Sequence, residues 1–107
     1  MEITIHGLPT CDSCRKARKA LPSARLRDIR AEPLTDTEIA AFLKQFGDRL
    51  LNRASTTWRG IPEDERQKSP QALLATYPAL MKRPVIRAGD ALYLGWTPDV
   101  RRALGVE

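Results

Sequence analysis

Hydrophobic and polar residues alternate at the start of the chain, and this pattern predicts a β-strand over residues 2–6. Residues 7–10 contain glycine and proline, which interrupt regular structure, so a loop is expected there. A helix is expected from about residue 11 to residue 21, because Pro22 cannot continue it. Residues 25–29 then predict a second, short strand, which completes a strand–helix–strand unit.

A strong helix start signal lies in the middle of the chain. Thr35 and Glu38 have the spacing of a capping box, in which each side chain bonds a free backbone amide of the other residue. The predicted helix extends to Gly47, because apolar residues recur before it at helical spacing: Ile39, Phe42, Leu43 and Phe46. The pattern that follows is weaker, and from it we predict a short helix at 50–52 and a helical turn at 63–67.

The last part of the chain predicts a helix, a hairpin and a final helix. A serine followed by a proline at 69–70 is typical of a helix start, and this helix should extend to about Tyr77. Strands are predicted at 85–87 and 91–94, joined by a tight turn, and the last helix at 97–104. The order of elements predicts an α/β fold, a mixed four-stranded β-sheet with flanking helices.

The chain has 107 residues, of which 42% are apolar. That size fits one compact domain, with enough apolar side chains to form a core without disulfide bonds. We find no apolar run of about 18 residues and no secretory signal pattern, so no membrane partner is expected and a cytoplasmic location is predicted. In that reducing compartment, paired cysteines are usually catalytic or metal-binding.

The net charge of +5 favours anionic partners, such as a peptide carboxylate, an oxyanion, a nucleic acid or an acidic protein surface. Nucleic acid is not expected, because only 6% of the residues are aromatic and no basic stripe is interleaved with them. A simply solvated set of lysines and arginines is the alternative explanation of the charge.

Cys11 and Cys14 form a Cys-x-x-Cys motif at the predicted start of the first helix. Free amides and a partial positive charge at a helix N-terminus stabilise a thiolate, which is the reactive form of cysteine. Cys11 is therefore the expected nucleophile, and Cys14 can attack a mixed disulfide formed at Cys11. Arg15 and Lys16 add positive potential beside the motif. A motif of this kind beside a strand–helix unit is typical of redox chemistry.

Several other residues are candidates for the same site. Thr10 and Ser13 can hydrogen-bond the thiolate or, more commonly for their residue types, cap the helix. Arg59 and Arg83 can hold an anion near Cys11, because a guanidinium binds carboxylates and oxyanions through two parallel hydrogen bonds. In a thioredoxin-like sheet, the proline before the third strand is expected to be cis and to face the cysteine loop, which assigns this place to Pro84.

Each candidate has a purely structural alternative. Cys14 can be a packed residue with no resolving role, and Arg59 can be a surface arginine. His6, the only histidine, is expected to be a structural or hydrogen-bonded residue rather than a base. Trp58 is expected to pack in the core or at its edge, although it could wall a pocket beside Arg59. No metal site is expected, because zinc needs four ligands and the chain has no second Cys-x-x-Cys pair.

Four segments that span nearly the whole chain carry a recognisable pattern: Gly7-x-Pro9-x-Cys11-x-x-Cys14-Arg15-Lys16-Ala17, Leu50-Leu51-Asn52-Arg53 with Thr56-Thr57-Trp58-Arg59, Met81-Lys82-Arg83-Pro84-Val85-Ile86, and Gly95 with the last helix. On these residues the chain resembles the arsenate-reductase-like family of ArsC, Spx and YffB proteins. The resemblance implies that residues 1–107 form one thioredoxin-like domain. Its core would be 1–32 and 81–107, and 33–80 would be a helical insertion.

The YffB-type branch, to which the likeness is greatest, implies a glutathione-dependent thiol reductase. No cofactor would be bound, and glutathione would be the co-substrate. Cys11 would be the nucleophilic thiolate, Cys14 or a second thiol would resolve the intermediate, and Arg83 would bind the anion. The predicted site consists of Cys11, Cys14 and Arg83 for catalysis, with Thr10, Ser13, Arg15, Arg59 and Pro84 for substrate binding.

Two other branches of the family imply different functions. In the Spx branch the two cysteines would be a redox sensor, and the partner would be RNA polymerase. A true arsenate reductase would surround its oxyanion with three arginines, of which Arg83 matches one. At the other two places the chain has Asn52 or Arg53, and Gly95-Trp96-Thr97, which contains no arginine.

Overall fold

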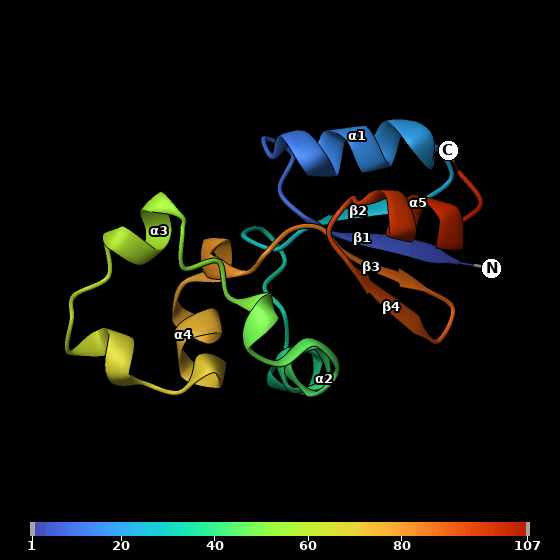
Figure 1. Ribbon diagram of the computed structural model, residues 1–107. Helices are drawn as coiled ribbons and strands as arrows, with labels where there is room; N and C mark the ends of the chain where they lie inside the picture. Colours follow the sequence, from blue (N-terminus) through green and yellow to red (C-terminus); the bar gives the residue numbers. More distant parts are fainter. Residues whose placement is uncertain (1, 107) are drawn as a thin grey trace. The chain divides into compact units, whose positions relative to one another are not determined.

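A computed structural model describes residues 2–106 of the chain (Figure 1). The chain divides into two compact units, one formed by residues 1–32 and 83–107 and the other by residues 33–82. The sequence places the second unit at 33–80, so the two boundaries differ by two residues at the C-terminal side. Within residues 2–106, no helix is long and apolar enough to cross a membrane.

The first unit is built on a four-stranded mixed sheet, as the pattern of the sequence predicts. Its strands are β1 (Ile3–Gly7), β2 (Arg25–Asp28), β3 (Val85–Ala88) and β4 (Ala91–Leu94), in the spatial order β2-β1-β3-β4. The pair β1–β2 is parallel, and the pairs β1–β3 and β3–β4 are antiparallel. The strand β1 therefore lies between β2 and β3, and Gly7, which the sequence assigned to a loop, is its last residue.

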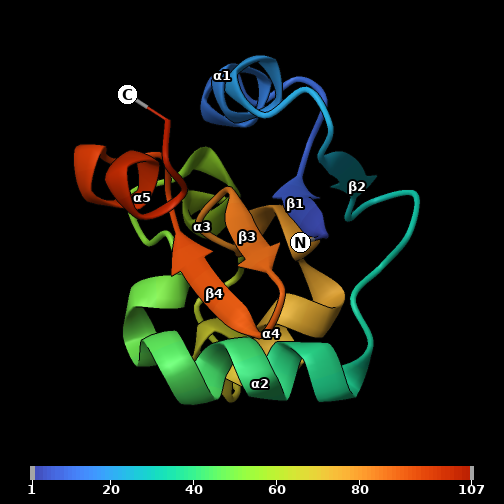
Figure 2. The ribbon, with the colours of Figure 1, turned by 90° about the vertical axis from the view of Figure 1, so that its right-hand side faces the viewer.

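The two faces of this sheet follow from the alternation of side chains along each strand. Ile5 pairs with Leu26 on one side and with Ile86 on the other. These side chains share a face with α1 (Asp12–Ala20) and α5 (Pro98–Ala103), and Figures 1 and 2 show both helices over that face. The buried residues of the cluster come from both helices and both central strands: Ile5, Ala17, Leu21, Ile86 and Val100.

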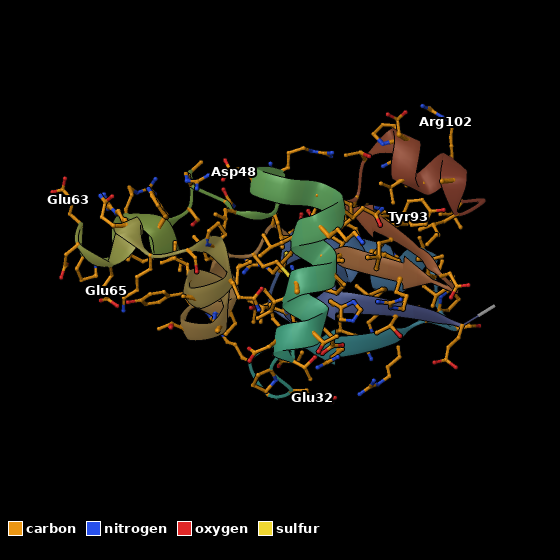
Figure 3. The ribbon with its side chains drawn as sticks, turned by 90° about the horizontal axis from the view of Figure 1, so that it is seen from below. Glu32, Asp48, Glu63, Glu65, Tyr93 and Arg102 are labelled. Carbon is orange, nitrogen blue, oxygen red and sulfur yellow. The ribbon has the colours of Figure 1, made fainter. Side chains whose placement is uncertain are left out.

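The turn that follows β2 ties this edge strand to the next part of the chain. Arg25 forms an ion pair with Glu32 at 2.6 Å, and Figure 3 labels Glu32 at the end of that turn. Asp28 accepts hydrogen bonds from the backbone amides of Arg30 and Ala31. Local polar contacts thus close the turn, although an exposed ion pair contributes less than about 1 kcal/mol.

The second unit is entirely helical. Its elements are α2 (Asp36–Phe46), η1 (Gly47–Leu50), α3 (Thr56–Arg59), η2 (Glu65–Gln67), α4 (Pro70–Thr76) and η3 (Pro78–Leu80). The predicted capping box is present at the start of α2, where the Glu38 amide donates to the Thr35 hydroxyl at 3.1 Å and the Thr35 amide donates to the Glu38 carboxylate at 2.8 Å. Ser69 caps α4 with Pro70 in the first turn, as its sequence indicates.

The predicted helix at 50–52 is wrong. The 3₁₀-helix η1 ends at Leu50, and Leu51 forms an isolated antiparallel bridge with Met81. The Asn52 amide donates to the Leu80 carbonyl at 2.9 Å, and the Lys82 amide donates to the Leu50 carbonyl at 2.7 Å. Pairing with a distant segment therefore replaced the local helical bonds that the apolar pattern suggested. The short helix α3, which Ser55 caps, was not predicted.

We expect the substitution Thr35→Ala to lower the free energy of unfolding by about 1 kcal/mol, because it removes one partner of the capping box. The variant Thr37→Ala is the matched control, since Thr37 is an exposed residue of the same first turn and has no capping role. It should be neutral or slightly stabilising, because alanine favours the helix. Urea unfolding measures both, and equal stabilities of the two variants would contradict the assignment.

Candidate active site

The cysteine loop connects the end of β1 to the start of α1. The amide of Cys11 donates to the Leu8 carbonyl at 3.1 Å, which closes a turn after Gly7. Cys11 has an extended backbone, φ −79° and ψ 125°, and its own carbonyl accepts from the Arg15 amide at 3.0 Å. Cys11 is thus the N-cap of α1, and its side chain lies at the positive end of the helix.

The Cys11 sulfur is partly exposed, and its surroundings favour the thiolate. Partial burial acts to raise the pKa of Cys11, but the Cys14 amide, the Cys14 thiol and the Arg83 guanidinium together lower the pKa below its ordinary value. The Cys11 side chain makes no capping hydrogen bond of ordinary geometry. The Cys14 amide therefore acts through the longer-range attraction of an N–H dipole for a negative charge, which becomes stronger when the sulfur ionises.

Cys14 has the opposite environment, since its side chain is 0% exposed. Burial is the largest cause that raises the pKa of Cys14, a hydrogen bond with the Leu8 backbone lowers it, the neighbouring Cys11 sulfur raises it, and the charge of Arg83 lowers it. Together these effects raise the pKa of Cys14 to about 12. Cys14 therefore stays a thiol at neutral pH, and a thiol can donate its hydrogen to the Cys11 sulfur. The Cys11 sulfur is therefore the one that ionises, and the Cys14 sulfur is the one that keeps its proton.

Arg83 and Pro84 come to this site from the segment that precedes β3. Arg83 interacts with the Cys11 sulfur by a side-chain hydrogen bond and by its charge. The Arg83–Pro84 peptide bond is cis, as the sequence predicts for the proline before this strand. Pro84 is fully buried, its carbonyl accepts from the Gly95 amide at 2.8 Å, and its side chain lies beside Gly7. The structure thus brings Cys11, Cys14, Arg83 and Pro84 together in one unit.

The capping role that the sequence suggested for Thr10 or Ser13 is wrong. Cys11 itself is the N-cap, so Thr10 precedes the helix and Ser13 is its second residue. Thr10 is exposed and Ser13 is half-buried. Arg15 is exposed in the first turn of α1, where its guanidinium lies 3.6 Å from the Asp12 carboxylate. All three are next to the cysteines in the chain, and their part in substrate binding stays a prediction.

Arg59 belongs to the second unit, at the end of α3, and donates to the Ala54 carbonyl at 2.9 Å. Its role toward Cys11 stays a prediction. The neighbouring Trp58 is half-buried and has two guanidinium groups, those of Arg53 and Arg66, each 5.2 Å from its ring centroid. Both lie within the range of a cation–π contact, so Trp58 takes part in local packing, as the sequence indicates.

His6 is buried, with 3% of its surface exposed. Its Nδ1 lies 3.0 Å from the Val85 carbonyl oxygen, which can only accept, so this nitrogen carries the proton and donates. The hydrogen bond joins β1 to β3 and gives His6 the structural role that the sequence indicates. Among residues 2–106, no group of three or more His, Cys, Asp or Glu side chains has the arrangement of a metal site.

Gly7 also belongs to this site, although the sequence pattern assigned it only to a loop. A Cβ at this position would lie 2.2 Å from the Cys14 Sγ, so only glycine leaves room for that sulfur. The signals in the sequence were its place four residues before Cys11 and its presence in the motif Gly7-x-Pro9-x-Cys11, and glycine in a loop is ordinarily explained by backbone freedom.

Known proteins resemble this chain in sequence and in fold. The structure of the YffB protein matches with a TM-score of 0.86 and 26% identity, over 94% of this chain and 96% of that one. An arsenate reductase (ArsC) related protein from Brucella melitensis is 34% identical over 96% and 93% of the two chains, with a TM-score of 0.73. The global transcriptional regulator Spx of Listeria innocua is 31% identical, over 95% of this chain and 86% of its own.

These likenesses agree with a match to a family model. The model of the ArsC family matches residues 6–104, a range that contains both cysteines, Arg83 and Pro84. The fold is thus the α/β thioredoxin-like fold of arsenate reductases, a four-stranded mixed sheet with flanking helices. The chain belongs to the ArsC family.

Proposed function

We propose that this ArsC-family protein is a thiol–disulfide oxidoreductase that uses glutathione as its co-substrate and Cys11 as its nucleophile. The observation that carries the proposal is the environment of the Cys11 sulfur, where the start of α1, the Cys14 thiol and Arg83 all favour the thiolate. Such a partly exposed, low-pKa sulfur next to a second thiol is typical of reactive cysteines. The proposal places the protein in the reducing cytoplasm, where reduced glutathione is available.

The first step is an attack of the Cys11 thiolate on a sulfur of a glutathione-containing disulfide. A bond forms between Cys11 and that sulfur, the original S–S bond breaks, and the other sulfur leaves as a thiolate that takes a proton from solvent. The protein now carries a mixed disulfide at Cys11. The negative charge of Cys11 is gone, and with it one cause of the raised pKa of Cys14, although the burial of Cys14 remains.

The second step breaks the mixed disulfide by one of two routes. In the first, Cys14 attacks the Cys11 sulfur, an internal Cys11–Cys14 disulfide forms, and glutathione leaves as a thiolate that takes up the proton of Cys14. In the second, the thiolate of a reduced glutathione attacks the bound glutathione sulfur, oxidised glutathione forms and leaves, and the Cys11 thiolate is re-formed. The internal disulfide needs two further glutathione thiols, which are oxidised as the two cysteines are reduced. Balance therefore requires glutathione as the reductant in either route.

Recognition of glutathione would rest on its negative charge. Arg83 is beside Cys11, Arg15 is in the first turn of α1, and a guanidinium binds a carboxylate with good geometry. The hydroxyl groups of Thr10 and Ser13 are one and two residues from Cys11 in the chain and would bind the peptide groups.

We expect the substitution Arg83→Gln to raise the pKa of the Cys11 thiol, because it removes a positive charge and a hydrogen bond from the thiolate. In the wild-type protein, alkylation of Cys11 should decline only as the pH falls through the lowered pKa. In the variant the decline should begin at a higher pH, and at pH about 6 the reaction should be roughly threefold to tenfold slower.

Iodoacetamide rates measured across pH test this expectation, with Arg30→Gln as the control. Arg30 is an exposed residue of the same unit, so its loss changes the net charge equally while Arg83 keeps its charge beside Cys11. A wild-type Cys11 that titrates at or above the usual thiol range of about 8.5 would remove the basis of the proposal.

Oxidised glutathione should add one glutathione moiety to Cys11 in the variant Cys14→Ala. The variant Cys11→Ala should remain unmodified under the same conditions, because Cys14 is fully buried and stays protonated. Peptide mass mapping identifies the modified residue. In the wild-type protein, a stable adduct assigns the second step to glutathione, and a rapid internal disulfide assigns it to Cys14. No modification of either cysteine would contradict the proposal.

A second candidate function is supported by the Spx relatives, which are named global transcriptional regulators. In that function the two cysteines would form a disulfide that switches a surface for RNA polymerase, and no substrate would be turned over. Pull-down of purified RNA polymerase with the oxidised and the reduced protein tests it. We expect no redox-dependent association, together with glutathione-dependent turnover of a small disulfide. Turnover of arsenate would instead favour an arsenate reductase.

A further inference from the structure

The Cys14 sulfur occupies the space of a missing side chain. Gly7 ends β1 and is buried beneath the start of the cysteine loop. A Cβ at Gly7 would lie 2.2 Å from the Cys14 Sγ and 3.3 Å from its Cβ. The first distance is far shorter than any non-bonded contact between a carbon and a sulfur atom. A side chain at position 7 and the Cys14 sulfur therefore cannot both occupy this space.

The backbone conformation does not explain this glycine. Positive φ angles occur within residues 2–106 at other glycines, Gly47, Gly89, Gly95 and Gly105, and Gly7 is not among them. Gly7 has the conformation of an ordinary strand residue, which alanine also adopts. Glycine is therefore required at position 7 because it has no side chain, and not because of its backbone conformation.

The backbone at Gly7 is held in the sheet and cannot move away from the Cys14 sulfur. Gly7 is paired with Asp28 of β2, and its carbonyl accepts from the Ile29 amide at 3.0 Å. On the other side, the Pro84 Cβ would lie 4.0 Å from a Cβ at Gly7. Because β1 is held between two strands, a larger residue at position 7 must displace Cys14 rather than the sheet.

We propose that Gly7 is a positioning residue of the thiol site. Because Gly7 has no side chain, the Cys14 sulfur packs against the end of β1 and is held beside the Cys11 sulfur. This inference rests on the proposed function only in taking Cys11 as the reactive thiolate. Cys14 is the third residue of α1, and an added methyl group at position 7 would move its sulfur relative to the Cys11 sulfur. The Cys14 thiol is one of the groups that favour the Cys11 thiolate.

The test is a cycle of four proteins: the wild type, Gly7→Ala, Cys14→Ala and the double variant Gly7→Ala/Cys14→Ala. The ultraviolet absorbance of the thiolate during a pH titration reports the ionisation of Cys11, and thermal unfolding reports stability. Gly7→Ala should shift the Cys11 titration to higher pH, with roughly tenfold less thiolate at a pH below the transition, because a charge-stabilising hydrogen bond is disturbed. It should also lower the melting temperature.

In the double variant the sulfur that collides with the added methyl group is absent, so the methyl group can occupy the space that the sulfur leaves. We expect the melting temperature to return close to that of Cys14→Ala, and the Cys11 titration to equal that of Cys14→Ala. This non-additivity would show that glycine is needed at position 7 to make room for the Cys14 sulfur, and that the strand does not require glycine there for another reason. If Gly7→Ala alone does not fold, recovery of a folded double variant gives the same support.

Gly60→Ala is the matched control. Gly60 also has an ordinary φ of −83°, and a Cβ there would meet its nearest atoms at 3.5 Å and 3.6 Å, which are normal contacts. It should leave the Cys11 titration unchanged. A wild-type titration in Gly7→Ala, or a double variant that loses stability additively, would overturn the inference. These readouts do not require turnover, so failure of glutathione-dependent activity leaves them interpretable.

Discussion

The candidate active site depends on one interaction, the attraction of a negative charge on the Cys11 sulfur to positive groups that surround it. The groups come from two distant parts of the chain, the start of α1 and the residue before β3. Both parts act against the partial burial of the sulfur, which opposes ionisation. The fold brings the arginine and the helix terminus to the same sulfur atom.

The strand β1 meets that requirement through its place in the sheet. It pairs in parallel with β2, so the chain must cross over through α1, and α1 then begins at the end of β1. It pairs antiparallel with β3, so the end of β1 lies at the start of β3, where His6 is opposite Val85. The cysteine loop and the Arg83–Pro84 segment consequently meet where β1 ends and β3 begins. The same geometry buries Cys14 against Gly7 and leaves Cys11 partly exposed.

Most of the regular structure could be predicted because it depends on neighbours in the sequence. The alternation in β1, the capping box at Thr35 and the serine–proline start of α4 are all local signals, and each element forms where its signal lies. The segment around Leu51 could not be predicted in this way. Its backbone bonds a distant segment, through the bridge with Met81, and no periodicity encodes such a partner.

The sequence by itself determined that a cysteine pair lies at a helix start and that an arginine and a proline precede a strand, and it carried the likeness to one family. Only the tertiary structure decided how the two sulfurs differ. Cys11 and Cys14 are chemically identical side chains, and burial against Gly7 keeps one protonated while Arg83 favours ionisation of the other. The physical reason is that a pKa depends on the atoms around a group in space, and those atoms come from strands that only the folded sheet brings together.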